Sequence, residues 1–267
     1  MRTLLLLLFH AFAVLPLAAH DELADQIHNA NHRIEQQPRN AELYLQRGEL
    51  YRLDEEWEKA ERDYRRALQL DPALEAVHFG RGLMLYESGR NSEAIHPLQR
   101  FIANHPDDPH ARVIFARVLM KLGRPVDAAV EYDAALTFLP WLDPDVIVER
   151  ARALAAAGRP SEALQALDDG MAQLGLLAAL QLTAIEIELQ TCHAEKALLR
   201  IEASEAAAPR KESWLARRGD ILHGLDREEE ARAAYRQALE ALALLPPERR
   251  QTRAMRELEN RLRTAIQ

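Results

Sequence analysis

The chain has 267 residues, of which 28% are charged and only 6% are aromatic, and it holds just 10 Gly and 13 Pro. Ala, Leu, Arg and Glu dominate, all of which favour helices over pleated strands, so the composition predicts an all-α protein and excludes a sheet-based one. The formal net charge of −8 excludes a general attraction to nucleic acid.

Residues 1–19 differ from the rest of the chain. Arg2 is their only charged residue, and the apolar stretch over residues 4–19 ends in small residues that suit a signal peptidase. A membrane-spanning helix needs about 20 apolar residues, whereas this stretch is shorter and contains His10. We therefore predict a signal peptide cleaved after Ala19, a periplasmic or secreted protein, and no integral membrane segment after cleavage. An uncleaved N-terminal anchor is the alternative.

Small and apolar residues recur every 34 residues between residue 41 and about residue 245. One extra residue enters near residues 141–143, after which the spacing resumes. Three sets of positions recur: Gly48, Gly82, Ala116, Ala151, Ile185 and Gly219; Ala60, Ala94, Ala128, Ala163, Ala197 and Ala231; and Tyr64, Leu98, Tyr132, Leu167, Ile201 and Tyr235. Six units of this length fit in the sequence.

Each unit contains the residues that two packed helices need. The small residue of the first set lets two helix axes approach, because a large side chain there would separate them. Gly89, Gly123 and Gly158 mark the turn between the two helices. Pro125 and Pro160 follow at the first turn of the second helix, where a missing N–H costs nothing. Further prolines prevent the second helix from continuing: Pro72, Pro106, Pro140 and Pro209.

These positions resemble the tetratricopeptide repeat. The clearest unit runs from Ala41 to Tyr51 and continues through Ala60, Tyr64, Ala67 and Pro72. The resemblance implies a right-handed superhelical solenoid of about six helix-turn-helix units over residues 41–245. The fifth unit departs from the pattern at Ile185, Cys192 and Ser204, but Ala197, Ile201 and Pro209 stay in phase.

Cys192 is the only cysteine, so an intramolecular disulfide is impossible. In an oxidising compartment a lone thiol is either buried or paired with another chain. Its place in the fifth unit favours burial, and we expect a buried side chain.

Both ends of the array resemble capping helices, which a stack needs to cover its last apolar surfaces. Residues 20–38 form the N-terminal cap, and residues 246–267 form the C-terminal cap. In the latter we expect one helix over Glu248–Gln267, with four apolar residues on one side: Met255, Leu258, Leu262 and Ile266.

We find no catalytic motif: no Gly-rich phosphate loop, no Gly-x-Ser-x-Gly elbow and no His-Glu-x-x-His pair. The sequence therefore predicts a protein that is not an enzyme and has no cofactor. Cleavage after Ala19 would place a free amine beside the imidazole of His20, and His28 and His32 lie four residues apart on the following helix. Such groups can bind copper, so a metal-binding accessory protein is an alternative function.

In tetratricopeptide repeat proteins the first helices line a concave groove that binds peptides or partner helices. Carried over position by position, the resemblance implies a partner-binding groove formed by Phe79, Leu83, Tyr86, Val113, Arg117, Met120, Arg152 and Arg217. Apolar, Met and Arg side chains of this kind provide anchoring area and paired charge. Leu45 and Glu49 occupy the places where a chaperone-tail clamp has Lys and Asn, so that specificity is not expected.

The preferred interpretation is an exported, non-enzymatic interaction module that binds a partner polypeptide in its groove. Two alternatives remain open: the copper-binding accessory protein, and a non-catalytic subunit of an envelope machine in which the stack only spaces other parts.

Overall fold

The structure is a computed structural model that describes residues 17–267, with side chains from residue 22 onward. Most of the predicted signal peptide (1–19) and the side chain of His20 therefore lie outside the described residues. Over residues 17–267 the chain forms fifteen helices and no strand, which confirms the all-α prediction. No helix in this part of the chain is both long and apolar enough to cross a membrane. The chain divides into two compact units, which meet in sequence between Leu122 and Gly123.

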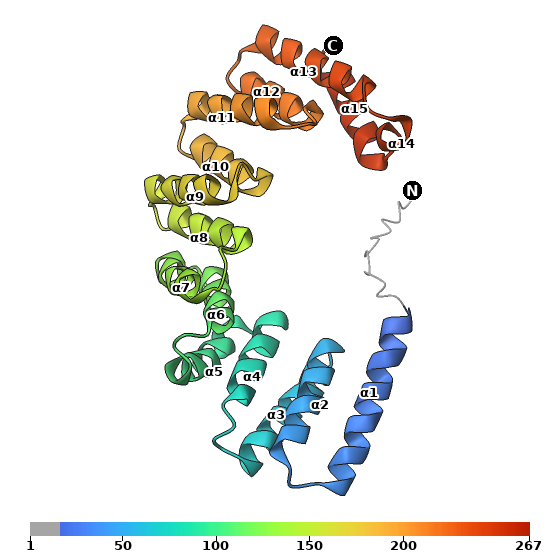
Figure 1. Ribbon diagram of the computed structural model, residues 1–267, viewed down its shortest axis with the longest axis vertical. Helices are drawn as coiled ribbons and strands as arrows, with labels where there is room; N and C mark the ends of the chain where they lie inside the picture. Colours follow the sequence, from blue (N-terminus) through green and yellow to red (C-terminus); the bar gives the residue numbers. More distant parts are fainter. Residues whose placement is uncertain (1–16) are drawn as a thin grey trace, which may run out of the picture. The chain divides into compact units, whose positions relative to one another are not determined.

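Unit 1 contains two helical hairpins with one further helix on either side (Figure 1). Helices α2 and α3 form the first hairpin, and α4 and α5 form the second, while α1 packs on α2 and α6 packs on α5. The bounds are α1 Leu17–Gln36, α2 Ala41–Leu53, α3 Trp57–Leu70, α4 Ala76–Glu87, α5 Asn91–Asn104 and α6 Pro109–Lys121.

Unit 2 starts with α7 and contains three hairpins, α8–α9, α10–α11 and α12–α13, with α15 packed on α13 (Figure 1). The bounds are α7 Pro125–Phe138, α8 Pro144–Ala156, α9 Pro160–Leu174, α10 Ala178–Gln190, α11 Ala194–Ala207, α12 Glu212–Gly224, α13 Glu228–Ala243, α14 Pro247–Arg250 and α15 Arg253–Ala265. The predicted prolines open their helices as expected, because α7 begins at Pro125 and α9 at Pro160.

The two helices of a hairpin cross where a small residue meets a large one sixteen positions later. A Cβ added to Gly48 would lie 2.9 Å from Tyr64, and one added to Gly219 would lie 2.3 Å from Tyr235. Tyr64 is fully buried and Tyr235 is 5% exposed, so the space that each glycine leaves is filled by an aromatic ring. The fifth unit instead buries Ile185, which belongs to the same core cluster as Ile201.

The turn between paired helices needs one residue with positive φ. Gly89 (φ 77°) and Gly158 (φ 77°) fill this position as predicted, because glycine adopts the left-handed region without strain. Cys192 fills it in the fifth unit with a φ of 61°. The predicted burial of Cys192 is wrong, since its side chain is exposed. The reason is the turn itself, whose backbone directs the residue away from the helix–helix core.

The C-terminal segment also differs from the prediction. It forms two helices, α14 and α15, because the chain turns at Thr252, whose hydroxyl accepts a hydrogen bond from the Met255 N–H (3.4 Å) and caps α15. Leu262 is fully buried, and Met255, Leu258 and Ile266 pack against the same core cluster, which contains residues of α10, α11, α12 and α13. These four residues thus share one face of α15, which covers the end of unit 2.

The close crossing at Gly82 gives a test of the repeat register. A Cβ at Gly82 would lie 2.6 Å from the Leu98 Cγ, so Gly82→Leu must push α4 and α5 apart. We expect a loss of about 1–3 kcal/mol in the free energy of unfolding, the usual cost of overpacking, although leucine's helix propensity offsets part of it. Denaturant titration measures the loss.

Glu228→Ala is the control for this substitution. The Glu228 carboxylate pairs with His223 (2.7 Å), but both side chains are about half exposed or more, and such pairs contribute little. A larger loss from Glu228→Ala than from Gly82→Leu would contradict the register.

His78 on α4 is a buried titratable group in unit 1. It is 5% exposed, and its Nε2 has no hydrogen-bond partner among the described residues. Burial lowers the pKa of His78 below its ordinary value of 6.5, and the charge of Arg100 lowers it further against the opposing effect of Glu75. The folded protein therefore holds this imidazole in its neutral form.

This pKa predicts a stability that falls in acid. Because the unfolded chain binds the proton at a higher pH than the folded chain, the contribution of neutral His78 is present above about pH 6.5 and is lost as the pH falls below it. We expect His78→Leu to flatten the pH dependence by up to about 1.4 kcal/mol per pH unit in that window. Unfolding titrations at about pH 7.5 and about pH 5.5 measure this. Substitution of the exposed His110 by Leu is the control, and equal effects of the two substitutions would contradict the assignment to His78.

Candidate functional site

Three of the predicted groove residues lie on α4, spaced four and three residues apart, which places them on one face of the helix. Helix α4 packs against α2 and α6, so the first helices of unit 1 lie side by side. Phe79, Leu83 and Tyr86 are each partly exposed. The Phe79 ring lies against Phe101 of α5, with the ring centroids 5.3 Å apart, so its inner edge is already held in the hairpin. The α4 surface thus offers apolar side chains that the hairpin does not fully cover.

The three predicted groove residues on α6 differ in how far they are exposed. Val113 is 7% exposed, so it serves packing more than binding. Arg117 and Met120 are partly exposed. Of this set, Met120 has the side chain best suited to an apolar contact.

A hydrogen-bonded chain joins α2, α3 and α4 on the same side of unit 1. Tyr64 donates to Glu49 (2.9 Å), Glu49 accepts from Arg52 (2.9 Å), and Arg52 also donates to Glu87 (2.7 Å). Burial, followed by the charge of Glu49, raises the pKa of the Tyr64 hydroxyl, so it stays a neutral donor. These charges satisfy one another and leave the apolar part of α4 as the available surface.

In unit 2, the predicted Arg152 lies on α8 beside α10. Its guanidinium is 3.8 Å from the Glu186 carboxylate of α10, and both side chains are about half exposed. The two residues line a hollow of about 290 Å³ between these first helices, together with Thr183, Ile187 and Gln190 among others. Arg152 is therefore accessible and only loosely paired.

The predicted Arg217 lies on α12 between two larger hollows. One of about 450 Å³ is lined by residues of α10, α12 and α15, including Leu182, Trp214 and Leu258. The other, of about 600 Å³, is lined by Leu189, Cys192, Ala194, Ile221, Gly224 and Leu225. Arg217 and Asp220 line both hollows.

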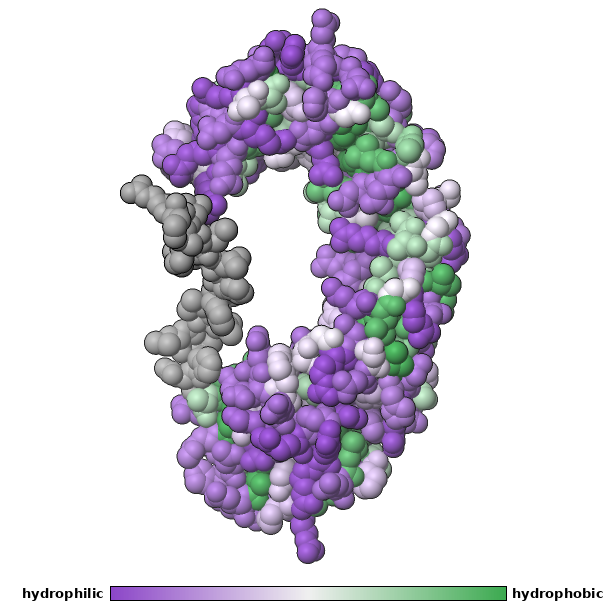
Figure 2. Space-filling model, turned by 180° about the vertical axis from the view of Figure 1, so that it is seen from behind, coloured by the Kyte–Doolittle hydropathy of each residue, from purple (hydrophilic) through white to green (hydrophobic). Residues whose placement is uncertain are grey.

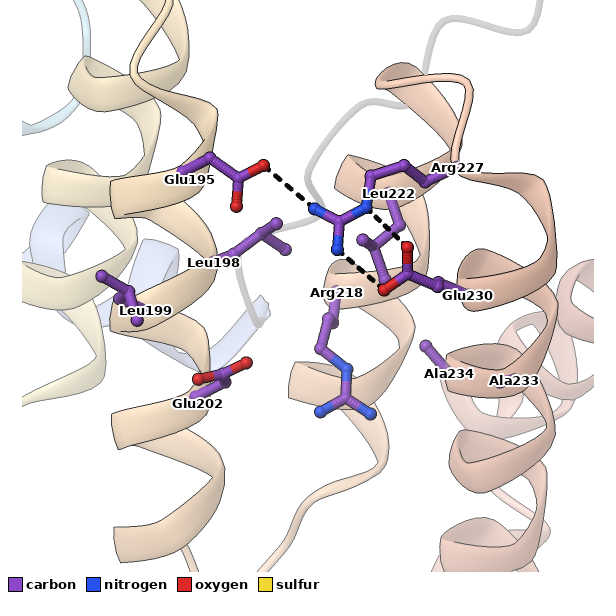
Figure 3. A pocket seen from close by; sticks show the side chains of 10 residues that line it. All are labelled: Glu195, Leu198, Leu199, Glu202, Arg218, Leu222, Arg227, Glu230, Ala233 and Ala234. Carbon is purple, nitrogen blue, oxygen red and sulfur yellow. Dashed lines mark hydrogen bonds and ion pairs between the residues drawn. The ribbon is translucent and has the colours of Figure 1, made fainter.

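A further hollow of about 420 Å³ opens among α11, α12 and α13, and it includes residues of the second helices (Figure 3). Leu198, Leu199 and Leu222 contribute its apolar part. Arg227 crosses its upper end in Figure 3, donating to Glu195 of α11 (3.0 Å) and to Glu230 of α13 (2.7 Å). These ion pairs neutralise Arg227 within the fold, and no cation of this hollow is left without an acidic partner, since Arg218 pairs with Glu205.

Hydrophilic side chains cover most of the visible surface of each unit, and apolar residues lie in separate patches (Figure 2). Four exposed apolar residues, which the sequence analysis missed, lie on α7 and the turn after it: Val126, Val130, Phe138 and Trp141. Spacing of four residues on a helix could have revealed the first two.

Sequence reasoning also missed the residues that complete the hollows around Arg217. Trp214, Leu258 and Arg261 lie in the 450 Å³ hollow, although the last two belong to α15, outside the repeats. The repeat register could not predict Leu258 and Arg261 at this hollow, because they reach it only through the packing of α15 on α13.

The histidine alternative receives no further support. The His28 and His32 Nε2 atoms are 3.1 Å apart, and His32 is also 3.3 Å from the Glu35 carboxylate. No group of three or more His, Cys, Asp or Glu side chains among the described residues is arranged to hold a metal ion. The side chain of His20 lies outside the described part of the chain.

Comparison with known proteins agrees with the helical hairpins. Family models described as tetratricopeptide repeat match residues 49–119 and residues 215–241. The DnaJ homolog subfamily C member 7 homolog of Schizosaccharomyces pombe is 28% identical over 179 residues, which cover 60% of this chain and 36% of that protein. The chain thus matches well under half the length of this curated relative.

Several solved structures have a fold similar to that of this chain. A tetratricopeptide repeat protein from Parabacteroides merdae has a TM-score of 0.59 and 14% identity, covering 92% of this chain and 94% of that one. YrrB, described as a tetratricopeptide repeat protein with an unusual peptide-binding site, has a TM-score of 0.58 and 22% identity, covering 70% of this chain and 95% of that one. At these identities the likeness concerns the fold.

Proposed function

Because this chain is a tetratricopeptide repeat protein, we propose that it is an exported, non-enzymatic module that binds a segment of a partner protein along its first helices. The observation that carries the proposal is the α4 surface, where Phe79, Leu83 and Tyr86 remain partly exposed beside other first helices. Soluble surfaces favour polar side chains, and neighbouring apolar ones commonly mark contact sites.

The charges of the first helices support the same proposal. Arg152 is more than half exposed, and its contact with the Glu186 carboxylate is long, at 3.8 Å. An acidic side chain of a partner protein that forms a shorter ion pair can therefore replace Glu186. Arg217 has two apolar hollows beside it. Peptide-binding surfaces combine apolar anchors with a few positioned charges. The unusual peptide-binding site of YrrB is a precedent on a similar fold.

Export is the second part of the proposal, and the apolar residues 4–19 support it. We expect cleavage after Ala19, so that the mature protein begins at His20. Intact-mass and N-terminal peptide analysis of protein recovered from the periplasm or medium measures this. Recovery of that pool with Met1 still attached would contradict cleavage and favour the uncleaved anchor.

The groove is tested with a partner recovered by crosslinking the mature chain in its own compartment. We expect Tyr86→Ala and Arg152→Glu each to weaken partner binding by more than about 1 kcal/mol. Both side chains are at least partly exposed, so helicity and the melting temperature should change little. Isothermal titration of each variant with the purified partner measures the effect.

Two variants on second helices are matched controls. Leu199→Ala truncates a leucine of α11 that is 65% exposed, and Arg232→Glu reverses an exposed charge on α13. Neither should weaken binding. Equal losses from these controls, or no loss from Tyr86→Ala and Arg152→Glu, would place the binding site elsewhere.

A further inference from the structure

We propose that the surface formed by α10, α12 and α15 selects one kind of partner segment: an extended stretch with an acidic side chain between two apolar ones, bound through Arg217. This inference rests on the proposed function, since it names the chemistry of the bound segment and the part of unit 2 that binds it.

Arg217 is the cation that the two hollows share. No hydrogen bond or ion pair within the described residues involves its guanidinium, although many other arginines of unit 2 are paired, as Arg218 is with Glu205 (2.9 Å). Its side chain is partly exposed. Arg217 thus presents free donors and a positive charge in the space between the two hollows.

Asp220 is the only anion among the described residues that line these hollows. Its Oδ1 accepts from Arg261 of α15 (2.7 Å) and from the Tyr235 hydroxyl (3.1 Å). Burial, then the Asp220 charge, raises the pKa of Tyr235 to about 12, so the hydroxyl stays a donor. Asp220 is therefore engaged by α13 and α15 and does not neutralise Arg217.

The two hollows together carry a positive charge. The charged side chains that line the two hollows are Arg217, Arg261 and Asp220, which leaves an excess of one positive charge. This local sign is opposite to the formal net charge of −8 of the whole chain. A partner carboxylate fits it, because a guanidinium binds a carboxylate through two parallel hydrogen bonds that strengthen where apolar side chains exclude water.

Apolar side chains line both hollows beside Arg217. Leu182, Trp214 and Leu258 line the hollow of about 450 Å³, and three other apolar residues line the hollow of about 600 Å³: Leu189, Ile221 and Leu225. In an extended chain the side chains at i, i+2 and i+4 lie on one face. An apolar–x–acid–x–apolar segment can therefore place its acid at Arg217 and one apolar side chain in each hollow.

The experiment uses the mature full-length chain and three sets of fluorescein-labelled peptides. Each peptide has Leu or Phe at the first and fifth positions of the motif and Ser at the second and fourth. The central residue is Asp or Glu in the acidic set, Asn or Gln in the amide set, and Lys in the basic set. Fluorescence anisotropy gives the dissociation constants.

We expect the acidic set to bind at least about tenfold more tightly than the amide set, in line with a charge-assisted pair. Arg217→Gln should abolish this preference, whereas Arg232→Gln on α13 should keep it. Arg217→Glu should reverse the selection in favour of the basic set, a gain that loss of folding cannot produce. Equal binding of the acidic and amide sets, or an acid preference that survives Arg217→Gln, would overturn the inference.

The same measurements separate this inference from the proposed function. If the crosslinked partner depends on Tyr86 and Arg152 but no peptide set depends on Arg217, the groove stands and the acidic specificity fails. If neither partner nor peptide binding depends on first-helix residues, both fail. A second copy of this chain is the other occupant to test, by sedimentation of the chain alone. Self-association that Arg217→Glu abolishes would overturn the inference, because a second copy would then occupy this surface in place of an acidic segment.

Discussion

The close crossing of two helices within each hairpin is the contact on which the rest of this structure depends. At Gly48, Gly82 and Gly219 the backbone of a first helix lies so close to a large side chain of the second helix that an added Cβ would force that side chain to shift. Close packing of this kind fixes the rotation of both helices. That rotation decides which residues of a first helix enter the core and which, such as Tyr86, remain at the surface.

A set of four arginines on first helices forms ion pairs with second helices, within one hairpin for Arg47 and with the preceding second helix for the other three. Arg47, Arg81, Arg150 and Arg218 each stand one residue before the small crossing residue of their unit, and each binds an acidic side chain on a second helix. Glu61, the partner of Arg81, is 6% exposed, so this charge is largely removed from water and depends on its partner. These four arginines are paired within the fold, whereas Arg217 has no such pair in the part of the chain whose side chains the structure describes.

The C-terminal helix α15 belongs both to the C-terminal cap and to the surface around Arg217. Leu262 is fully buried with the α12 and α13 core, which holds α15 in place. Arg261, the residue before it, then reaches Asp220 of α12, and Leu258 lines the hollow beside Arg217. A segment that covers the exposed end of the array thus also supplies one wall of the surface for which we propose acidic specificity.

The sequence by itself determined the helical hairpins, since the 34-residue spacing of Gly48, Gly82 and Tyr64, Leu98 follows directly from helix packing. It also identified the first-helix positions of Arg152 and Arg217. Tertiary structure decided the rest: the exposure of Cys192, which a left-handed turn sets, and the two-helix C-terminal segment, which depends on the Thr252 cap. It also decided that Asp220 is engaged, by partners from α13 and α15, while no hydrogen bond or ion pair among residues 22–267 involves the Arg217 side chain. A repeat register relates equivalent positions, but it does not show which side chains meet across helices.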